Sequence, residues 1–206
     1  MATDTYEFEA QNDSLEAYEW DDLWWDHPAD TSLPRITYIG DSISRGTRKA
    51  MAPLVSGTLL LDNFATSKAL DHPCFCPALS LFFSQQKRCD ALFFNNGLHG
   101  WHLADSEYAA YYEKMICFLQ KSRPDTPIIA VLSTYLANGE QDRRVQARNE
   151  IARSIAERYG LPILDFYTVA KQNASAMISD GVHFEKEGYC ALANEMLKFL
   201  TPILVK

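Results

Sequence analysis

The stretch Ile36-Thr37-Tyr38-Ile39-Gly40-Asp41-Ser42 decides the fold, because a run of strand-forming residues passes directly into a polar turn. The first four residues predict a buried strand, and the glycine with its two polar neighbours predicts a tight turn out of it. Open α/β sheets bind their ligands where parallel strands end, at the carboxyl edge. Ser42 is therefore expected at a ligand-binding edge, although a lone Gly-Asp-Ser triplet is also typical of an ordinary turn.

A second segment near the end of the chain, Asp180-Gly181-Val182-His183, carries a carboxylate and an imidazole three residues apart. A serine nucleophile needs a general base, and that base needs a hydrogen-bond acceptor to orient it. Taken alone, Asp180 could cap a helix and His183 could be a solvated histidine. Combined with Ser42, they favour a hydrolase.

A third segment, Asn95-Asn96-Gly97, follows the apolar run from Ala91 to Phe94. Polar amides at the end of a buried strand are costly unless they find hydrogen-bond partners. An asparagine at this place can donate a hydrogen bond to a developing oxyanion. The structural alternative is a turn built on Asn-Gly.

Taken in this order, Gly40-Asp41-Ser42, Asn95 and Asp180 with His183 resemble the blocks of the SGNH (GDSL-type) hydrolase family. The resemblance covers about residue 35 to the C-terminus. It implies that Ser42 attacks an ester carbonyl and that His183, oriented by Asp180, takes the serine proton. It further implies that the Asn95 amide and the Ser42 backbone N–H meet the oxyanion, and that no cofactor takes part.

Two of the blocks depart from the family pattern. The third block usually reads Gly-x-Asn-Asp, whereas this chain reads Phe94-Asn95-Asn96. The second block has no glycine, because residues 62–68 read Asp-Asn-Phe-Ala-Thr-Ser-Lys. Counting from Asn63 places Lys68 where the family's glycine offers its backbone N–H, or Ser67 if the loop is shorter.

The remaining sequence alternates between strand and helix patterns, which predicts a parallel sheet covered on both faces. Together with the resemblance, this predicts a three-layer α/β/α sandwich with a central parallel five-stranded sheet (the flavodoxin-like SGNH fold). The expected strands cover residues 36–39, 58–61, 90–94, 127–132 and 161–165, and the expected helices 44–55, 78–83, 106–121, 141–159 and 186–200. The long helix over 141–159 is expected to carry several arginines on its outer face.

Charge divides the chain into two parts. Residues 1–30 contain ten acidic residues and no Lys or Arg, so the net charge of −8 belongs to this segment. We expect an acidic, Trp-rich N-terminal arm over 1–30, with a short helix or turn over 14–25 that packs its tryptophans on a hydrolase domain over 31–206. This charge balance argues against nucleic acid or a membrane surface as a partner. The N-terminus lacks the pattern of a signal peptide, so the expected location is cytoplasmic.

Metal and redox chemistry find no support in the pattern. His27, His72, His99 and His102 show no metal-ligand spacing, and no metal site is expected. Five cysteines without CxxC spacing are expected to be buried free thiols. A phosphate loop over Gly40–Gly46 lacks the Lys-Ser/Thr ending that a nucleotide site requires.

The expected substrate is a small-molecule ester. No long apolar segment is available to wall an acyl tunnel, which favours small acyl groups. Trp101 and His99, close to Asn95 in sequence, are candidate substrate-binding residues, because aromatic rings stack on sugars. Because many members of the family that the chain resembles remove acetyl groups from sugars, the resemblance implies a carbohydrate O-acetylesterase as the favoured function. The alternatives are a short-chain esterase, lipase or thioesterase of the same family, or a catalytically silent binding module. The oligomeric state is not predicted.

Overall fold

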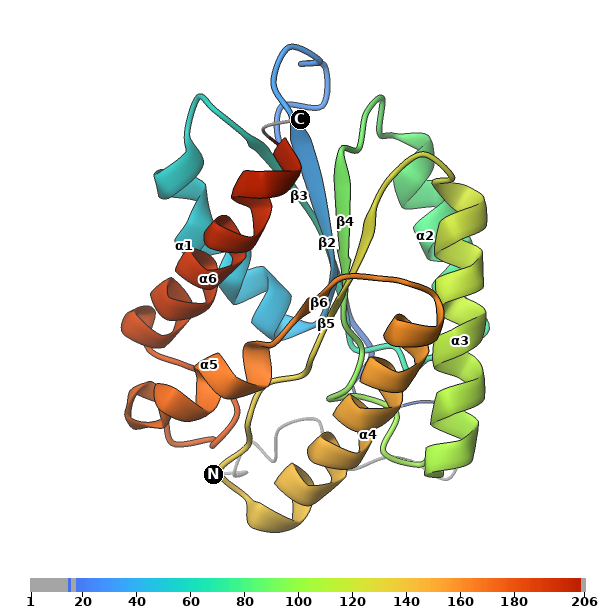
Figure 1. Cartoon of the computed structure of the whole chain (residues 1–206), viewed down its shortest axis with the longest axis vertical. Coiled ribbons are helices and arrows are strands. Elements are labelled where there is room, and N and C mark those ends of the chain that lie inside the picture. The colour runs from blue at the N-terminus through green and yellow to red at the C-terminus, as the bar shows by residue number, and fades with distance from the viewer. Residues whose placement is uncertain (1–14, 16–17, 205–206) are drawn as a thin grey trace.

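The computed structural model describes residue 15 and residues 18–204, apart from the side chains of 201–204, and these residues form three layers (Figure 1). The central layer is a six-stranded sheet in the order β1-β3-β2-β4-β5-β6. Helices α1, α5 and α6 cover one face, and α2, α3 and α4 cover the other. The three-layer α/β/α fold predicted from the sequence is thus confirmed. The strands are β1 (Asp21–Trp24), β2 (Arg35–Gly40), β3 (Leu60–Thr66), β4 (Ala91–Phe94), β5 (Ile128–Val131) and β6 (Ile163–Leu164). The helices are α1 (Ser42–Val55), α2 (Phe75–Ser84), α3 (Asp105–Ser122), α4 (Gly139–Arg158), α5 (Phe166–Gln172) and α6 (Lys186–Leu204).

The predicted number of strands was wrong, because a sixth strand joins the five parallel ones. β1 runs antiparallel to β3, with Asp21 opposite Thr66 and Trp24 opposite Asn63. Within the segment expected as a helix or turn, residues 21–24 therefore form a strand. β1 has only 4 residues, and its partner strand lies about forty residues away in sequence. The local sequence pattern therefore does not predict this pairing. The division of the chain at residue 30 stays a prediction.

β3 is longer than expected because two polar residues inside it are buried and paired. Asp62 accepts a hydrogen bond from the Arg35 guanidinium at 2.5 Å, and both side chains are almost fully buried. The Asn63 amide donates to the Tyr38 carbonyl at 2.7 Å and to Ser44 Oγ at 3.0 Å. The partners of Asp62 and Asn63 lie on β2 and α1, so the local sequence does not show that they are paired. Two polar residues after an apolar run therefore indicated that the strand had ended.

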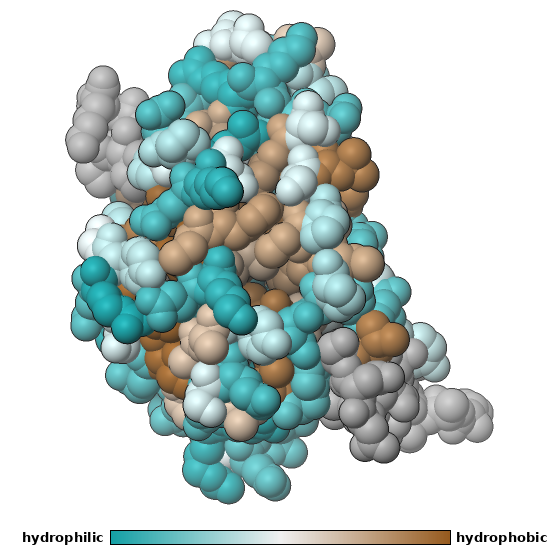
Figure 2. All heavy atoms as spheres, turned by 90° about the vertical axis from the view of Figure 1, so that its right-hand side faces the viewer, coloured by the Kyte–Doolittle hydropathy of each residue, from teal (hydrophilic) through white to brown (hydrophobic). Residues whose placement is uncertain are grey.

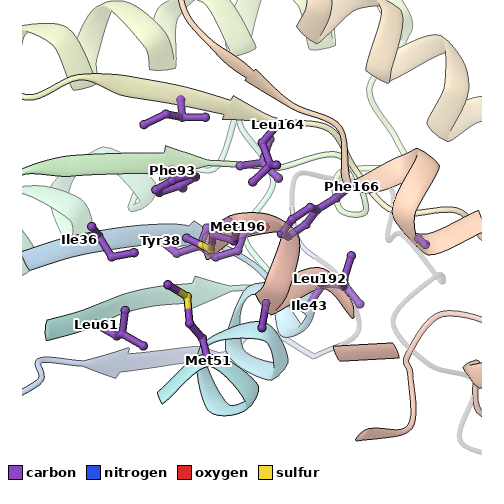
Figure 3. Packing of buried hydrophobic residues seen from close by; sticks show 14 of the residues in the cluster. Ile36, Tyr38, Ile43, Met51, Leu61, Phe93, Leu164, Phe166, Leu192 and Met196 are labelled. Carbon is purple, nitrogen blue, oxygen red and sulfur yellow. The ribbon is translucent and has the colours of Figure 1, made fainter. Parts of the chain in front are cut away.

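The two faces of the sheet carry separate apolar cores. Side chains of β2 and β4 such as Tyr38 and Phe93 pack with α1, α5 and α6 (Figure 3). The next residues along the same strands, Ile39 and Phe94, point to the other face and pack with α2, α3 and α4. α5 is a helix that the sequence analysis missed. Hydrophilic residues surround a strip of apolar surface on the α3 side of the molecule (Figure 2).

α1 and α6 pack closely because α1 contains a glycine where the two helices meet. A Cβ atom on Gly46 would lie 2.2 Å from a ring carbon of Tyr189, which is far inside van der Waals contact.

Among the described residues, no helix combines the length and apolar character needed to cross a membrane.

Candidate active site

The Gly40-Asp41-Ser42 turn joins the central strand β2 to α1. A Cβ atom on residue 40 would lie 2.9 Å from the Cβ of Ser44, so glycine is required for the turn to close. Asp41 caps α1, because its Oδ1 accepts the Ile43 backbone N–H at 2.9 Å. Ser42 is the first residue of α1 and lies at the carboxyl edge of the sheet, as the sequence predicts.

The Asp180–His183 segment is a tight loop held by its own backbone. Gly181 has a φ of +72°, a conformation that disfavours residues with a side chain. Asp180 Oδ1 accepts the backbone N–H groups of Val182 and His183, both at 2.9 Å. The His183 carbonyl in turn accepts the Ile178 N–H at 2.9 Å. The aspartate and histidine are therefore fixed relative to each other before any ligand binds.

Ser42, His183 and Asp180 form a continuous hydrogen-bonded chain. His183 Nδ1 lies 2.7 Å from Asp180 Oδ2, and His183 Nε2 lies 2.7 Å from Ser42 Oγ. A carboxylate can only accept, so Nδ1 carries the proton and Nε2 is left to accept the serine hydroxyl. This arrangement allows the imidazole to act as a general base toward the serine.

Asp180 is held in its ionised form. Burial raises the pKa of its carboxyl, but hydrogen bonds from the His183 ring and from the backbone N–H groups of His183 and Val182 outweigh burial. The net pKa therefore lies below the usual range for aspartate. The negative charge that orients His183 persists at neutral pH and is lost only in acid.

The two asparagines after β4 have different partners. Asn95 Nδ2 donates to the Val131 carbonyl at 2.8 Å and to Ser133 Oγ at 3.0 Å, so both of its amide hydrogens are used. Asn96 Nδ2 donates to the Lys68 carbonyl at 2.9 Å, which places this amide beside the loop that follows β3. Both amide hydrogens of Asn95 are therefore bonded, whereas only one of those of Asn96 is bonded to another described residue.

The loop after β3 contains both residues considered for the second block. The Ser67 N–H donates to the Trp20 carbonyl at 3.2 Å, which continues the pairing of the sheet edge. The Lys68 N–H donates to Thr66 Oγ1 at 3.1 Å, and its ammonium group lies 2.7 Å from Asp21 Oδ2. The lysine side chain is thus engaged by β1.

The predicted substrate-binding residues are buried. Trp101 and His99 have exposed fractions of 8% and 2%. The guanidinium groups of Arg144 and Arg148 lie 5.3 and 4.9 Å from the Trp101 ring centre, where a sugar would otherwise stack. Substrate contact by Trp101 and His99 stays a prediction without support from these positions.

Arg148 is a residue that the sequence analysis did not single out among the arginines of α4. It is fully buried, not on the outer face of α4, and it donates to the carbonyls of Gly97, His99 and Gly100 at 2.6–3.2 Å. It thereby fixes the loop that follows Asn96. Its position was visible in the spacing, because Arg148 falls in the same helical stripe as the buried residues Val145 and Ala152.

A groove of about 600 Å³ opens beside Ser42 and His183. We call it the α1/α6 groove, because one wall comes from α1 and the other from α6. Its α1 residues form two rows with a spacing of four, 42, 46, 50 and 54 beside 45, 49 and 53, which corresponds to about 18 Å of helix from Ser42 to Leu54. The sequence offered no single apolar segment to wall such a channel, because each helix contributes only one face. The described lining residues are Ser42, Arg45, Gly46, Lys49, Ala50, Pro53, Leu54, His183, Lys186, Tyr189 and Cys190.

The described residues contain no group of three or more His, Cys, Asp or Glu side chains placed to hold a metal ion. All five cysteines are free, and Cys74 and Cys117 are exposed, so the expectation that all are buried was wrong. Neither belongs to the two apolar cores of the sheet, and the number and spacing of cysteines in the sequence do not reveal this.

No family model matches the chain, and no curated protein matches its sequence. Solved structures do match. A member of the lipolytic protein G-D-S-L family from Veillonella parvula DSM 2008 has a TM-score of 0.60 at 20% identity, covering 81% of this chain and 98% of its own. The acetyl xylan esterase AlAXEase has a TM-score of 0.63 at 17% identity, covering 81% and 99%.

A catalytic mutant of Axe2, an acetylxylan esterase from Geobacillus stearothermophilus, has a TM-score of 0.61 at 13% identity, covering 82% of this chain and 94% of its own. Likeness at these identities concerns the fold. The chain therefore has the fold of the lipolytic G-D-S-L (SGNH-type) hydrolases.

Proposed function

We propose that this protein is a serine hydrolase of carboxylic esters. The observation that carries the proposal is the chain of two 2.7 Å hydrogen bonds from Asp180 through His183 to Ser42. This chain lies at the carboxyl edge of the sheet and at the mouth of the α1/α6 groove. The shared fold with G-D-S-L hydrolases supports the same reaction class.

The proposed reaction runs in two halves. Ser42 Oγ attacks the ester carbonyl while His183 Nε2 takes its proton, and His183 then gives that proton to the leaving alcohol. Water, activated by the same imidazole, releases the acid from Ser42. Asp180 keeps the proton on Nδ1 and stabilises the imidazolium that forms transiently.

The oxyanion is proposed to be met by the backbone N–H of Ser42, by one asparagine amide, and by the Lys68 N–H once it releases Thr66 Oγ1, its partner at 3.1 Å. The sequence analysis assigned the amide to Asn95. The hydrogen bonds favour Asn96, because it lies beside Lys68 and only one of its amide hydrogens is bonded to another described residue.

For the substrate, the first candidate is an acetyl ester of a carbohydrate. Two of the solved structures with this fold are acetyl xylan esterases, which supports a sugar as the alcohol part. A second candidate, a longer aliphatic ester or thioester, is favoured by the mostly apolar lining of the α1/α6 groove. The two differ in which part of the ester occupies the groove.

The test is a panel of acetylated xylo-oligosaccharides and 4-nitrophenyl esters from acetate to octanoate, with Ser42→Ala as the blank. We expect kcat/KM for acetate to exceed that for octanoate, because the groove would hold the alcohol and leave little space beyond the acyl methyl. A preference for octanoate would replace the first candidate with the second. Absence of Ser42-dependent hydrolysis across the panel would remove the proposal of an ester hydrolase.

A further prediction concerns Lys68, whose backbone but not side chain is proposed to act on the oxyanion. Lys68→Ala keeps the N–H, so kcat should stay within about threefold of the unmutated protein. The free energy of unfolding should fall by about 1 kcal/mol, because the ion pair with Asp21 is lost. Asp21→Asn is the matched control and should lower stability similarly. A collapse of kcat in Lys68→Ala with unchanged stability would instead place the ammonium in the reaction.

A further inference from the structure

The α1/α6 groove combines apolar walls with positive charge. Arg45 and Lys49 lie four residues apart on one face of α1, and Lys186 faces them from the first turn of α6. Among the described residues that line the groove, none is acidic. The whole chain carries a net charge of −8, so this local sign is opposite to that of the molecule.

The three cations are not equally compensated. Arg45 lies 3.5 Å from Asp22 Oδ2, and its guanidinium lies 5.4 Å from the Trp20 ring centre. Lys49 and Lys186 are exposed and form no ion pair with any other described residue. Glu185 and Glu187 flank Lys186 in sequence but do not line the groove. The positive charge of the two lysines is therefore available to a ligand.

The N-termini of both helices lie at the catalytic end of this groove, the end that holds Ser42 and His183. α1 begins at Ser42 and α6 begins at Lys186, next to His183. The N-terminus of a helix carries a partial positive charge that favours a nearby anion. The helix ends thus add positive potential near Ser42 and Lys186, but not at Lys49, because the effect falls off within the first turn.

The spacing of residues along α1 sets the distance between the catalytic serine and Lys49. Lys49 is seven residues beyond Ser42 on the same helix, which is about 10 Å along the axis. Between them the wall is made by Gly46 and the ring of Tyr189. Burial raises the pKa of Tyr189, so its hydroxyl stays neutral and adds no competing negative charge. A ligand that extends along α1 from Ser42 passes this apolar stretch before it reaches Lys49, whereas Lys186 lies near His183 at the catalytic end of the groove.

We propose that the α1/α6 groove selects esters that carry a carboxylate or phosphate about 10 Å from the scissile carbonyl. The segment between the anion and the ester lies on the apolar wall, and the anion pairs with Lys49, while Lys186 adds positive charge on the α6 wall nearer to His183. This inference rests on the proposed ester hydrolysis and names the class of substrate that the same site prefers.

The test compares each anionic ester with a neutral analogue in which a carboxamide replaces the carboxylate. In one arm the anion is on the acyl side: the mono-4-nitrophenyl ester of an eight-carbon dicarboxylic acid. In the other arm it is on the alcohol side: the acetyl ester of 8-hydroxyoctanoate. The readout is the ratio of kcat/KM for the anionic ester to that for its carboxamide. The arm with the higher ratio identifies which part of the substrate occupies the groove.

We expect a ratio of about three to ten in at least one arm at low salt, because each exposed charge pair contributes up to about fivefold. The ratio should fall toward one in the double variant Lys49→Gln/Lys186→Gln, and it should also fall at high salt. Lys121→Gln is the matched control, since Lys121 is an exposed lysine on α3, across the sheet from the groove, and its loss should leave the ratio unchanged.

A ratio near one in both arms, or a ratio that survives the double variant, overturns the inference. Such a result leaves the ester hydrolase intact as long as the neutral carboxamides are still cleaved with Ser42 present and not with Ser42→Ala. If no ester is cleaved in a Ser42-dependent manner, it is the proposed function that fails. The two failures are therefore distinguishable.

Discussion

Replacing Ser42 with alanine is expected to lower kcat for 4-nitrophenyl acetate by at least about a thousandfold, because the nucleophile is lost. His183→Ala should have an effect of similar size, since without the imidazole the serine keeps its proton. Neither change empties a core position, because both side chains belong to the polar chain at the sheet edge. Initial rates at saturating ester measure the effect.

Thermal unfolding provides the control for both variants, which should unfold within a few degrees of the unmutated protein. The double variant Ser42→Ala/His183→Ala should be no slower than either single variant, because the residues act as one unit. Retention of more than about a tenth of the original kcat in either single variant would contradict the assignment of the triad.

The second large effect is expected at Asn96, and it separates the two asparagines. Asn96→Ala should lower kcat by about a hundredfold or more with little change in KM, because a donor to the oxyanion acts mainly in the transition state. Asn95→Ala should mainly lower stability, since its amide joins β4 to Val131 and Ser133. Steady-state kinetics and thermal unfolding on both variants give the comparison.

Asn96 also holds the Lys68 carbonyl, so part of its effect could come from movement of that loop. Lys68→Ala keeps the loop backbone and serves as the reference for such movement. The opposite pattern, a silent Asn96→Ala and a severely slowed Asn95→Ala, would return the oxyanion role to Asn95 and show that its bonds to β5 exchange during the reaction.

Much of the site could be predicted from sequence because its parts are local. A strand that runs into Gly40-Asp41-Ser42 needs no distant partner to be recognised. The Asp180–His183 pair is fixed within four residues by its own backbone hydrogen bonds. The structure brings the two segments within hydrogen-bonding distance, although only Ser42 follows a strand and the Asp180–His183 loop directly precedes α6.

The features that the sequence did not reveal all depend on partners far along the chain. Asp62 is a strand residue only because Arg35 neutralises it on the next strand. Arg148 can be buried because three backbone carbonyls surround it. The choice between Asn95 and Asn96 depends on β5 and on the loop after β3, neither of which the local pattern shows.

The pairing of β1 with β3 has a consequence for the solubility of shortened forms of this protein. A chain beginning at residue 31 would keep the triad, yet it would leave β3, all of whose residues are now buried, as the outer strand. An open, apolar edge of this kind is a template on which other molecules add their strands. β1 thus covers this edge against intermolecular pairing, and we expect a chain shortened beyond residue 24 to be limited by aggregation rather than by loss of the triad.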